Sequence, residues 1–541
     1  MKTKYIIYII CLFISSLYMS CKKEDNSFLS SIPYLFRPAN FQVTTNKTVA
    51  TITWAPVDSA VSYTIQISED SLLFQNIIIT DTLKTTTLVV ELGGNTLYSA
   101  RVKANARNSN KDSKYNETVT FRTPPENIFD GFSSFMTEQG ASQISWLPGA
   151  SATKLVFSSA GKSDVPFDIS STEVASGKKA CTGLANGTYT VSIYNGQFVR
   201  GTVSLTLEGD VWVRPGDNLS TALASVTKDS SVVILTPGNY GIGSAVTNFT
   251  QNIKLRGLYK DTVSTVYMTS GASTTANMLN INNANQLNYI RFENIAFSGY
   301  VDNINGGTKI GYLFNQSTAI NLNELSFKNC IIRDIGNTPV RLKDAPIKTI
   351  GSLLVDNCKI FDIGYSSVYA IVNNNVAGCV INNISFTNST IYNFAGSLVL
   401  HSSGNSNSVV VKNCTFNEIA TSGTGSSIRY LIDYYANTTT TYTVNNGVII
   451  QNCIFGSTPR PYTDGVRVSS ATNKQISGSY ATADYKDNNA TTTFSIVGSL
   501  TAYSGLSTDL FIAPTSGNFN FKDAAFVGRK VAGDPRWWSA Q

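Results

Sequence analysis

Several side chains between residues 341 and 429 could together bind an acidic sugar. Arg341, Lys343 and Arg429 are cations, Tyr369 is an aromatic ring, and His401 is the only histidine of the chain. Cations pair with the carboxylates of uronate sugars, and flat rings stack on sugar faces. The sequence therefore predicts these five residues as a substrate-binding set for an acidic polysaccharide.

The segments that carry these residues alternate apolar and polar side chains, as a β-strand with one buried face does. They cover residues 340–343, 368–371, 398–401 and 429–434. The apolar positions predicted to point inward are Val340, Leu342, Val368, Ala370, Leu398 and Leu400. The alternate positions, expected to point outward on neighbouring strands, are Arg341, Lys343, Tyr369 and His401. In the fourth segment two phases remain open, with either Arg429 and Asp433 or Tyr430 and Tyr434 facing out.

Other kinds of site lack the residues they need. A single histidine excludes a multi-histidine metal site and argues against a histidine-based catalytic triad. The acids of this region are Asp334, Asp344, Asp356, Asp362, Glu418 and Asp433. Only Asp344 and Asp433 fall near the proposed strands, so we expect neither a Ca²⁺ cage nor the close carboxylates of a glycoside hydrolase. No cofactor is therefore predicted for a binding protein.

The same region contains an internal repeat: an apolar residue, any residue, an asparagine and a small or apolar residue. Six copies cover residues 292–295, 327–330, 355–358, 386–389, 411–414 and 450–453, with asparagines 25 to 39 residues apart. Repeats of this length predict units stacked one on the next. Asparagine tolerates a left-handed backbone, so each copy predicts a sharp turn, and stacked turns predict a ladder of bonded amides. The next position should point inward, so the cysteine found there in four copies is expected to be buried. Free thiols stacked between coils are favoured, and disulfides remain the alternative.

The composition agrees with many short strands joined by polar turns. The chain has 541 residues, of which 42% are hydrophobic and only 14% are charged, against about 25% charged in an average soluble protein. This profile argues against a coiled coil or a long helical protein. The formal net charge of +6 is too small and too dispersed to indicate a nucleic-acid partner.

The N-terminal segment is predicted to export the chain and to anchor it. A basic start and a short apolar run are typical of a signal peptide over residues 1–20. Ser20 before Cys21 resembles a bacterial lipobox, in which the cysteine is lipidated after cleavage. The charged residues that follow resemble surface-export signals of Bacteroidetes lipoproteins. The resemblance implies an outer-membrane protein that is lipid-anchored through Cys21 and faces the cell exterior, with residues 21–33 as a linker.

Two segments after the linker are predicted to form β-sandwiches, because short alternating strands follow one another at turn-bounded spacing. Residues 34–124 resemble a fibronectin type III domain, with Trp54 as the core tryptophan and Tyr98 at the tyrosine corner. Residues 125–209 repeat the pattern more weakly, with Trp146 in the matching place. Such modules most often serve as spacers.

Residues 210–483 resemble a pectate-lyase-like, right-handed parallel β-helix, with 484–541 as its closing and capping segment. The resemblance rests on the repeat and on an opening strand, helix and strand over 211–235. It implies that the asparagine turn joins the second and third sheets, and that substrates lie on the outer face of the first sheet. Family members that cleave uronates use Ca²⁺ held by acids and an arginine or lysine as base. In a lyase, Arg341 or Lys343 would be that base.

The sequence thus predicts an all-β chain with two fibronectin type III-like sandwiches followed by a parallel β-helix. The first functional hypothesis is a cell-surface lipoprotein that binds a polysaccharide in glycan utilisation, beside other glycan-uptake proteins. The second is a polysaccharide lyase that acts by β-elimination on a uronate polymer, with Ca²⁺ as its cofactor. The third is a structural or adhesive surface protein. The incomplete catalytic set favours the first hypothesis.

Overall fold

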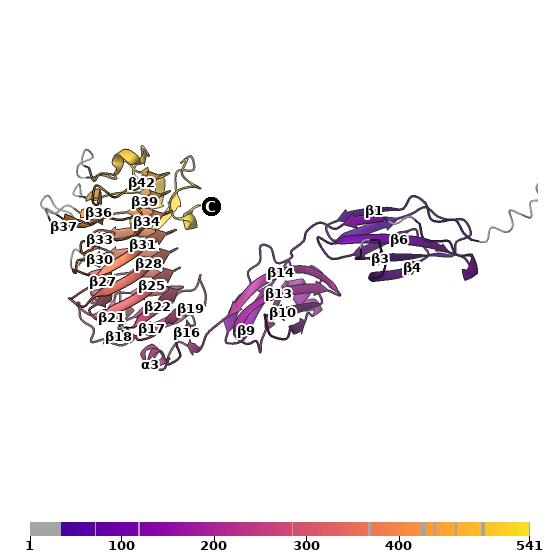
Figure 1. Cartoon of the computed structure of the whole chain (residues 1–541), viewed down its shortest axis with the longest axis horizontal. Helices are drawn as coiled ribbons and strands as arrows, with labels where there is room; N and C mark the ends of the chain where they lie inside the picture. Colours follow the sequence, from indigo (N-terminus) through magenta and orange to yellow (C-terminus); the bar gives the residue numbers. More distant parts are fainter. Residues whose placement is uncertain are drawn as a thin grey trace, which may run out of the picture. The chain divides into compact units, whose positions relative to one another are not determined.

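The chain forms two compact units, residues 1–207 and 208–541. The computed structural model describes residues 34–539 apart from 71, 117–118, 284, 366–368, 423–428, 438–439, 460–462 and 488–492. The predicted leader, Cys21 and the linker lie outside the described residues. Antiparallel sandwiches occupy the first unit and long parallel sheets the second, so the predicted all-β class is confirmed (Figure 1). In the described part, no helix is long and apolar enough to cross a membrane.

The first sandwich has the core predicted for a fibronectin type III-like domain. Its three-stranded sheet contains β1 (Gln42–Asn46), β2 (Val49–Thr53) and β5 (Thr87–Glu91). Its four-stranded sheet contains β4 (Ile77–Leu83), β3 (Ser62–Ser68), β6 (Leu97–Asn105) and β7 (Val119–Arg122), and η2 (Ser109–Lys111) is a 3-10 turn after β6. Trp54 and Tyr98 are buried, and the Tyr98 hydroxyl accepts a 2.9 Å hydrogen bond from the Gly93 N–H. This bond closes the predicted corner.

The second sandwich repeats this plan. One sheet contains β8 (Phe135–Glu138), β9 (Ala141–Ser145) and β12 (Lys178–Cys181), and the other contains β11 (Val165–Asp168), β10 (Lys154–Ser158), β13 (Gly187–Asn195) and β14 (Phe198–Leu207). A short helix, α2 (Ser171–Ser176), connects the sheets and ends at a left-handed glycine, Gly177. Trp146 is fully buried, as its predicted equivalence to Trp54 requires.

A buried arginine links the two sandwiches within the first unit. Arg200 on β14 donates from Nε and Nη2 to the Glu126 carboxylate at 2.6 and 2.9 Å, and its Nη1 lies 2.5 Å from Glu91 on β5. Asn195, at the tip of the β13–β14 hairpin, also donates to Glu91 at 2.7 Å. A buried guanidinium is costly unless all its partners stay in place. These contacts therefore favour a stiff connection, which suits a spacer.

The second unit winds through three parallel sheets, here named A, B and C. Sheet A contains β15 (Val211–Val213), β16 (Ser231–Leu235), β19 (Ile253–Gly257), β22 (Gln286–Glu293), β25 (Ile320–Lys328), β28 (Lys348–Asp356), β31 (Val380–Thr387), β34 (Ser408–Lys412), β39 (Val448–Gln451) and β42 (Lys474–Ser477). Sheet B contains β17 (Gly238–Gly241), β20 (Ser264–Tyr267), β23 (Ile295–Ser298), β26 (Ile331–Arg333), β29 (Lys359–Ile363), β32 (Thr390–Phe394), β35 (Thr415–Asn417), β40 (Ile454–Phe455), β43 (Tyr480–Ala481) and β44 (Thr501–Ala502). Sheet C contains β18 (Thr247–Phe249), β21 (Asn277–Ile281), β24 (Tyr312–Gln316), β27 (Thr338–Leu342), β30 (Val372–Asn374), β33 (Val399–His401), β36 (Arg429–Asp433) and β41 (Thr463–Arg467). One strand from each sheet makes one coil, which is the arrangement of a parallel β-helix.

The predicted asparagine turns join sheet A to sheet B in six successive coils. All six asparagines have a positive φ, between 51° and 56°, which is the left-handed region that asparagine tolerates. Their amides form a ladder: Nδ2 of Asn329 donates to Asn294 at 3.0 Å, and Nδ2 of Asn357 donates to Asn329 at 2.6 Å. Between Asn357 and Asn388 the ladder is interrupted, because Arg536 donates to the Asn357 side chain at 2.8 Å and Asn388 turns to Asp356. It resumes where Nδ2 of Asn413 donates to Asn388 at 2.9 Å. The predicted turn is thus confirmed.

Inside the coils, equivalent side chains stack on one another. Phe292 lies over Phe327 with ring centroids 5.2 Å apart, and Phe416 lies over Phe455 at 5.1 Å. The cysteines that follow the ladder asparagines are fully or almost fully buried, and the six described cysteines are free thiols. At the first coil, α3 (Leu219–Ala224) buries Leu219 and Leu223 against the core and closes that end.

The C-terminal segment returns along sheet B. It contains α4 (Ser507–Leu510), β45 (Phe511–Ala513), β46 (Asn518–Phe521) and the 3-10 turn η6 (Pro535–Trp537), and two further 3-10 turns are η4 (Val497–Ser499) and η5 (Pro514–Ser516). The Trp537 indole N–H donates to Thr390 on β32 at 2.8 Å, and the buried Asp534 accepts from the same hydroxyl at 2.7 Å. The predicted capping segment therefore packs, through Trp537, against the side of the coils, because Asp534 and Arg536 bind there.

Substitution of one ladder asparagine should separate its role in the left-handed turn from its role in the amide hydrogen bonds. We expect Asn329→Ala to destabilise the solenoid by about 3 kcal/mol, because alanine is strained in the left-handed region and two amide hydrogen bonds are lost. Asn329→Gly keeps the turn and loses only the bonds, so it should cost about half as much. Urea unfolding of the two variants measures the difference. Equal losses would contradict a conformational role for the asparagine.

Candidate functional site

The outer face of sheet C carries one row of mostly polar side chains, with one residue from each coil. The strand register pairs Asn315 with Arg341, Arg341 with Asn373, Asn373 with Leu400, and Asp433 with Arg467. We define the polar row as Asn248, Asn280, Asn315, Arg341, Asn373, Leu400, Asp433 and Arg467. Neighbouring strands lie about 4.8 Å apart. The row therefore places a polar residue on every coil from Asn248 to Arg467 except that of Leu400.

Four successive members of the row have buried polar atoms without a hydrogen-bond partner among the described residues. These atoms are Oδ1 of Asn280, Oδ1 of Asn315, Nε of Arg341, and both Oδ1 and Nδ2 of Asn373. Asn373 is completely buried. An unpartnered buried polar group costs roughly 1–3 kcal/mol, so native proteins rarely keep several in one place without a bound molecule or ordered water. Among the described residues, this stretch is the part of sheet C with the most uncompensated buried polar atoms.

Arg341 is the centre of this stretch. Its guanidinium lies 4.5 Å from the centre of the Tyr369 ring and 5.6 Å from that of Tyr312, and its Nη1 donates to the Tyr312 hydroxyl at 3.2 Å. No described carboxylate lies within 4.0 Å of it. The predicted outward direction of Arg341 and Tyr369 agrees with these contacts. A half-buried cation between two rings, with no described carboxylate to neutralise it, can bind an anionic or hydroxyl-rich ligand.

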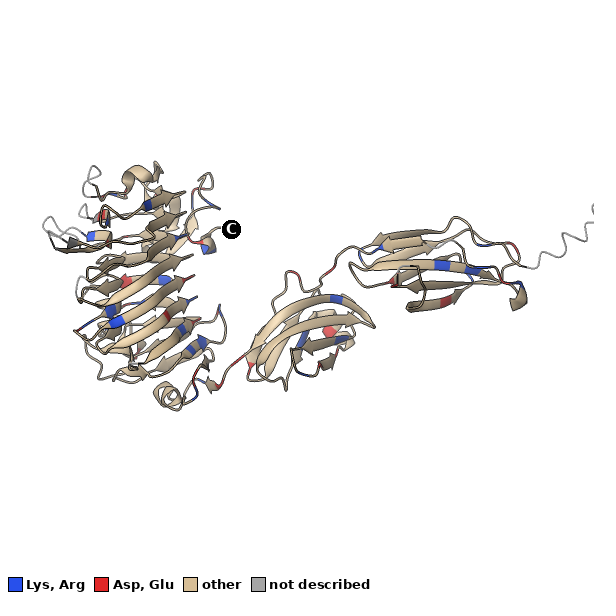
Figure 2. Cartoon of the chain, in the orientation of Figure 1, with Lys and Arg blue, Asp and Glu red and all other residues tan. Residues whose placement is uncertain are grey.

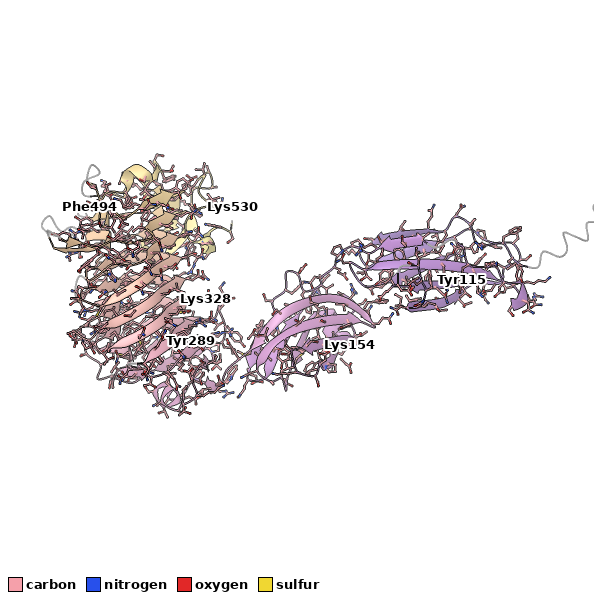
Figure 3. The ribbon with its side chains drawn as sticks, in the orientation of Figure 1. Tyr115, Lys154, Tyr289, Lys328, Phe494 and Lys530 are labelled. Carbon is pink, nitrogen blue, oxygen red and sulfur yellow. The ribbon has the colours of Figure 1, made fainter. Side chains whose placement is uncertain are left out.

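Arg467, at the far end of the row, is neutralised by a carboxylate, unlike Arg341. Its Nε and Nη2 donate to the two carboxylate oxygens of Asp433 at 2.8 and 2.7 Å. The guanidinium lies 4.0 Å from the centres of the Tyr430 and Tyr435 rings. Phe494, labelled in Figure 3, packs edge-on against Tyr430 with centroids 5.8 Å apart. This cation is neutralised and enclosed, so we assign it a mainly structural role.

Lys343 and Arg429 are not part of the Arg341 cluster. Lys343 follows β27, is 43% exposed and lies 3.7 Å from Asp344, a surface pair that contributes little to stability. Arg429 lies on β36, three strands from Arg341, which corresponds to about 14 Å. The structure therefore keeps only Arg341 and Tyr369 of the five predicted residues in direct contact.

The predicted outward direction of His401 is wrong. His401 is completely buried and stacks on Tyr434 with ring centroids 5.1 Å apart. Its Nε2 accepts a 3.1 Å hydrogen bond from the Ile381 N–H and lies 3.0 Å from Nδ2 of Asn374. The predicted inward position of Leu400 is wrong for the same reason. Val399 pairs with the inward Val372 instead, which turns Leu400 out and His401 in.

The structure also decides which side chains face outward in two other predicted segments. The second segment begins its strand at Val372 rather than within 368–371. Val368 lies outside the described residues, and Tyr369 precedes the strand. In the fourth segment the open choice is settled for Asp433, because Tyr434 is buried with its hydroxyl donating to Ser406 at 2.8 Å. Arg429 shares the strand with Asp433 without pairing to it within 4.0 Å.

The acids near the row do not fit a calcium ion. Asp433 is held by Arg467, and Asp344 is exposed beside Lys343. In the part of the chain that the structure describes, no three His, Cys, Asp or Glu side chains are arranged to hold a metal ion. Figure 2 shows acidic and basic residues scattered over the solenoid rather than gathered in one patch.

A second left-handed row lies at the corner between sheets B and C. Asp334, Asp362, Asn393 and Glu418 have φ between 50° and 60°. Burial raises the pKa of Asp362 and of Glu418, and the Asp362 carboxylate adds to the effect at Glu418. Asp334 is instead paired with Arg333 at 2.6 Å. The left-handed turn accounts for these residue types, since aspartate and asparagine tolerate it best.

Sequence reasoning missed the asparagines of the polar row and Arg467. A signal for them exists, because each row residue but the first follows a buried apolar residue, as in Leu279-Asn280, Phe314-Asn315 and Val466-Arg467. These pairs recur 26 to 35 residues apart. This spacing is similar to that of the ladder asparagines, so alignment of the coils on those asparagines would also have aligned the row residues.

Comparisons with known proteins concern the fold and not the site. A family described as a domain of unknown function (DUF4957) matches residues 238–394, and another domain of unknown function (DUF5123) matches residues 409–537. No curated protein matches the chain. The two fibronectin type III domain segment of chicken tenascin is 15% identical, with 31% of this chain and 97% of that chain covered and a TM-score of 0.17. The FN1–FN3 domains of chicken CNTN1 are 16% identical, with 32% and 67% covered and a TM-score of 0.15.

Because His401 is buried, its protonation should change the free energy of unfolding with pH. Burial lowers its pKa from 6.5 to about 4. Between pH 6.5 and pH 4, His401 is protonated in the unfolded chain but not in the folded chain. The free energy of unfolding therefore falls as the pH is lowered from 6.5 to 4, by on the order of 3 kcal/mol. We expect His401→Gln to remove this part of the pH dependence in urea unfolding. NMR of the single histidine in an untagged chain checks the pKa directly; protonation near pH 6.5 would contradict the burial.

Proposed function

We propose that the protein is a lipid-anchored cell-surface protein whose solenoid binds an acidic polysaccharide along the polar row of sheet C. The observation that carries the proposal is the Arg341 guanidinium, which lies between the Tyr312 and Tyr369 rings with no described carboxylate within 4.0 Å. Polar side chains of the row flank it on the neighbouring coils, an arrangement that suits a polymer better than a compact ligand. Arg341 supplies a cation that no described carboxylate neutralises, which suits the carboxylate of a uronate.

The remaining parts of the proposal rest on the sequence. The lipobox-like Cys21 and the charged residues after it resemble those of Bacteroidetes outer-membrane lipoproteins, and the repeat resembles pectate-lyase-like solenoids. We propose that the chain faces the cell exterior and works beside other glycan-uptake proteins. The sandwiches would then act as a spacer that holds the solenoid away from the anchor.

Loss of Arg341 should weaken polysaccharide binding selectively. We expect Arg341→Ala to lower the affinity for polygalacturonate at least tenfold, because removal of a charge-assisted hydrogen bond costs roughly 1.5–3 kcal/mol. Tyr369→Ala should lower it less, through loss of ring stacking. Affinity electrophoresis or calorimetry measures both effects.

The chain offers a matched control on another sheet. Arg291 lies 4.3 Å from the ring centre of Tyr289, which is labelled in Figure 3, but it is neutralised by Glu324 at 2.8 Å. Arg291→Ala removes the same charge from the outer face of sheet A and should leave the affinity unchanged. Equal losses from Arg291→Ala and Arg341→Ala would contradict a site on sheet C. No affinity of the native chain for any acidic glycan would favour a structural or adhesive role.

The lyase hypothesis is kept as the second candidate because Arg341 lies on the sheet where the family resemblance places a catalytic base. A chain beginning at Asn26 is mixed with polygalacturonate, alginate or chondroitin, with and without Ca²⁺, and ultraviolet absorbance follows the new conjugated double bond. We expect a flat trace, because the acids near the row are paired with cations. A rise that Arg341→Ala or Lys343→Ala abolishes would establish the lyase and overturn the binding role.

A further inference from the structure

One end of the first sandwich carries an open groove lined by exposed aromatic rings and cations. The groove has a volume of about 820 Å³ and lies between the first described residues, the loop after β2 and the loop after β6. Phe36 is 72% exposed and Tyr34 is 56% exposed. Exposed apolar side chains that gather in one patch mark an interaction site more often than singly exposed ones do.

The exposed rings are fixed to the sandwich. The Leu35 N–H donates to the Lys111 carbonyl at 2.8 Å, and the Ala55 N–H donates to the Ala39 carbonyl at 2.8 Å. The segment from Tyr34 to Ala39 is thus held at both ends by the two loops. Its aromatic side chains are therefore presented to solvent by a defined backbone.

The charges of the groove are mainly positive. Arg37, Arg107 and Lys111 line it and are exposed, and Asp58 is the acid that lines it. None of the three cations forms an ion pair within 4.0 Å with a described carboxylate; the nearby Asp112 pairs with Lys103. The groove therefore combines an apolar patch with an unneutralised positive rim.

The place of this groove in the chain suggests what covers it. Tyr34 follows Cys21 by thirteen residues, which span at most about 45 Å when fully extended. A lipid on Cys21 would keep this end of the sandwich within that distance of the membrane. Aromatic rings and long cationic side chains are the groups that bind best at a membrane surface, where rings lie among headgroups and cations meet anionic ones.

We propose that this end of the first sandwich is a membrane-contact surface that binds anionic lipid headgroups. Tyr34 and Phe36 enter the headgroup layer, and Arg37, Arg107 and Lys111 bind its anionic groups. The inference rests on the proposed anchor at Cys21, which would place the surface beside the lipid. The contact would orient the first sandwich on the cell surface.

The test uses a chain beginning at Asn26, which contains every described residue but no lipid. Co-sedimentation compares vesicles of phosphatidylcholine with vesicles in which a third of the lipid is phosphatidylglycerol. We expect at least tenfold tighter binding to the anionic vesicles, with loss of this gain in high salt. Phe36→Ser should weaken binding to both kinds of vesicle, and Arg107→Gln with Lys111→Gln should weaken binding to the anionic vesicles at least fivefold.

The matched control removes two other exposed lysines. Lys47 lies in the β1–β2 turn at the opposite end of the same sandwich, and Lys178 lies on the second sandwich. Lys47→Gln with Lys178→Gln should change the affinity less than twofold, although the net charge falls equally. The same loss in both double variants, or no vesicle binding by the native chain, would overturn the proposal. Binding of polygalacturonate in place of vesicles, lost in Arg107→Gln with Lys111→Gln, would overturn it in favour of a glycan site.

The proposed anchor at Cys21 and the proposed membrane-contact surface can be tested independently. Mass spectrometry of the Cys21 peptide from cells tests the lipid, and the vesicle assay tests the groove. Lipidated Cys21 without vesicle binding would overturn the surface alone. Vesicle binding with unmodified Cys21 would support the surface and overturn the proposed anchor.

Discussion

The solenoid depends on one backbone constraint, a left-handed turn at the same place in every coil. A chain that must leave sheet A and enter sheet B within a single residue needs a positive φ, and asparagine supplies it with little strain. The same side chain then donates its amide to the coil before it, as Asn329 does to Asn294. The turn thereby fixes both the path of each coil and its register on the next.

Register is what brings the candidate site together. Residues 26 to 35 positions apart become neighbours because each coil repeats the same hydrogen-bonded step. Loops of different length leave the coils between sheets without disturbing that step. A polar row can therefore be assembled from single residues, such as Asn315, Arg341 and Asn373, that share no local motif.

The two arginines of the row show how burial separates a structural cation from one available for binding. Arg467 has a bidentate carboxylate partner and two covering rings, so its charge is already compensated. Arg341 has a hydroxyl partner and two rings but no described carboxylate, and its neighbour Asn373 has no partner at either amide atom. The two residues are of the same type and differ in their partners. A ligand group that compensates a charge would therefore stabilise Arg341 more than Arg467.

The sequence by itself determined the all-β class, the two sandwiches and the left-handed turns, because strand alternation and the asparagine repeat are local properties of the chain. It also placed Arg341 and Tyr369 on the outer face. Tertiary structure decided the phase of β33, and with it the burial of His401, because pairing with β30 outweighed the apolar character of Leu400. It also decided that Asp433 binds Arg467 and that Arg536 enters the ladder at Asn357, 179 residues away. These contacts depend on the number of residues in each loop and on the return of the chain's end, which no local pattern encodes.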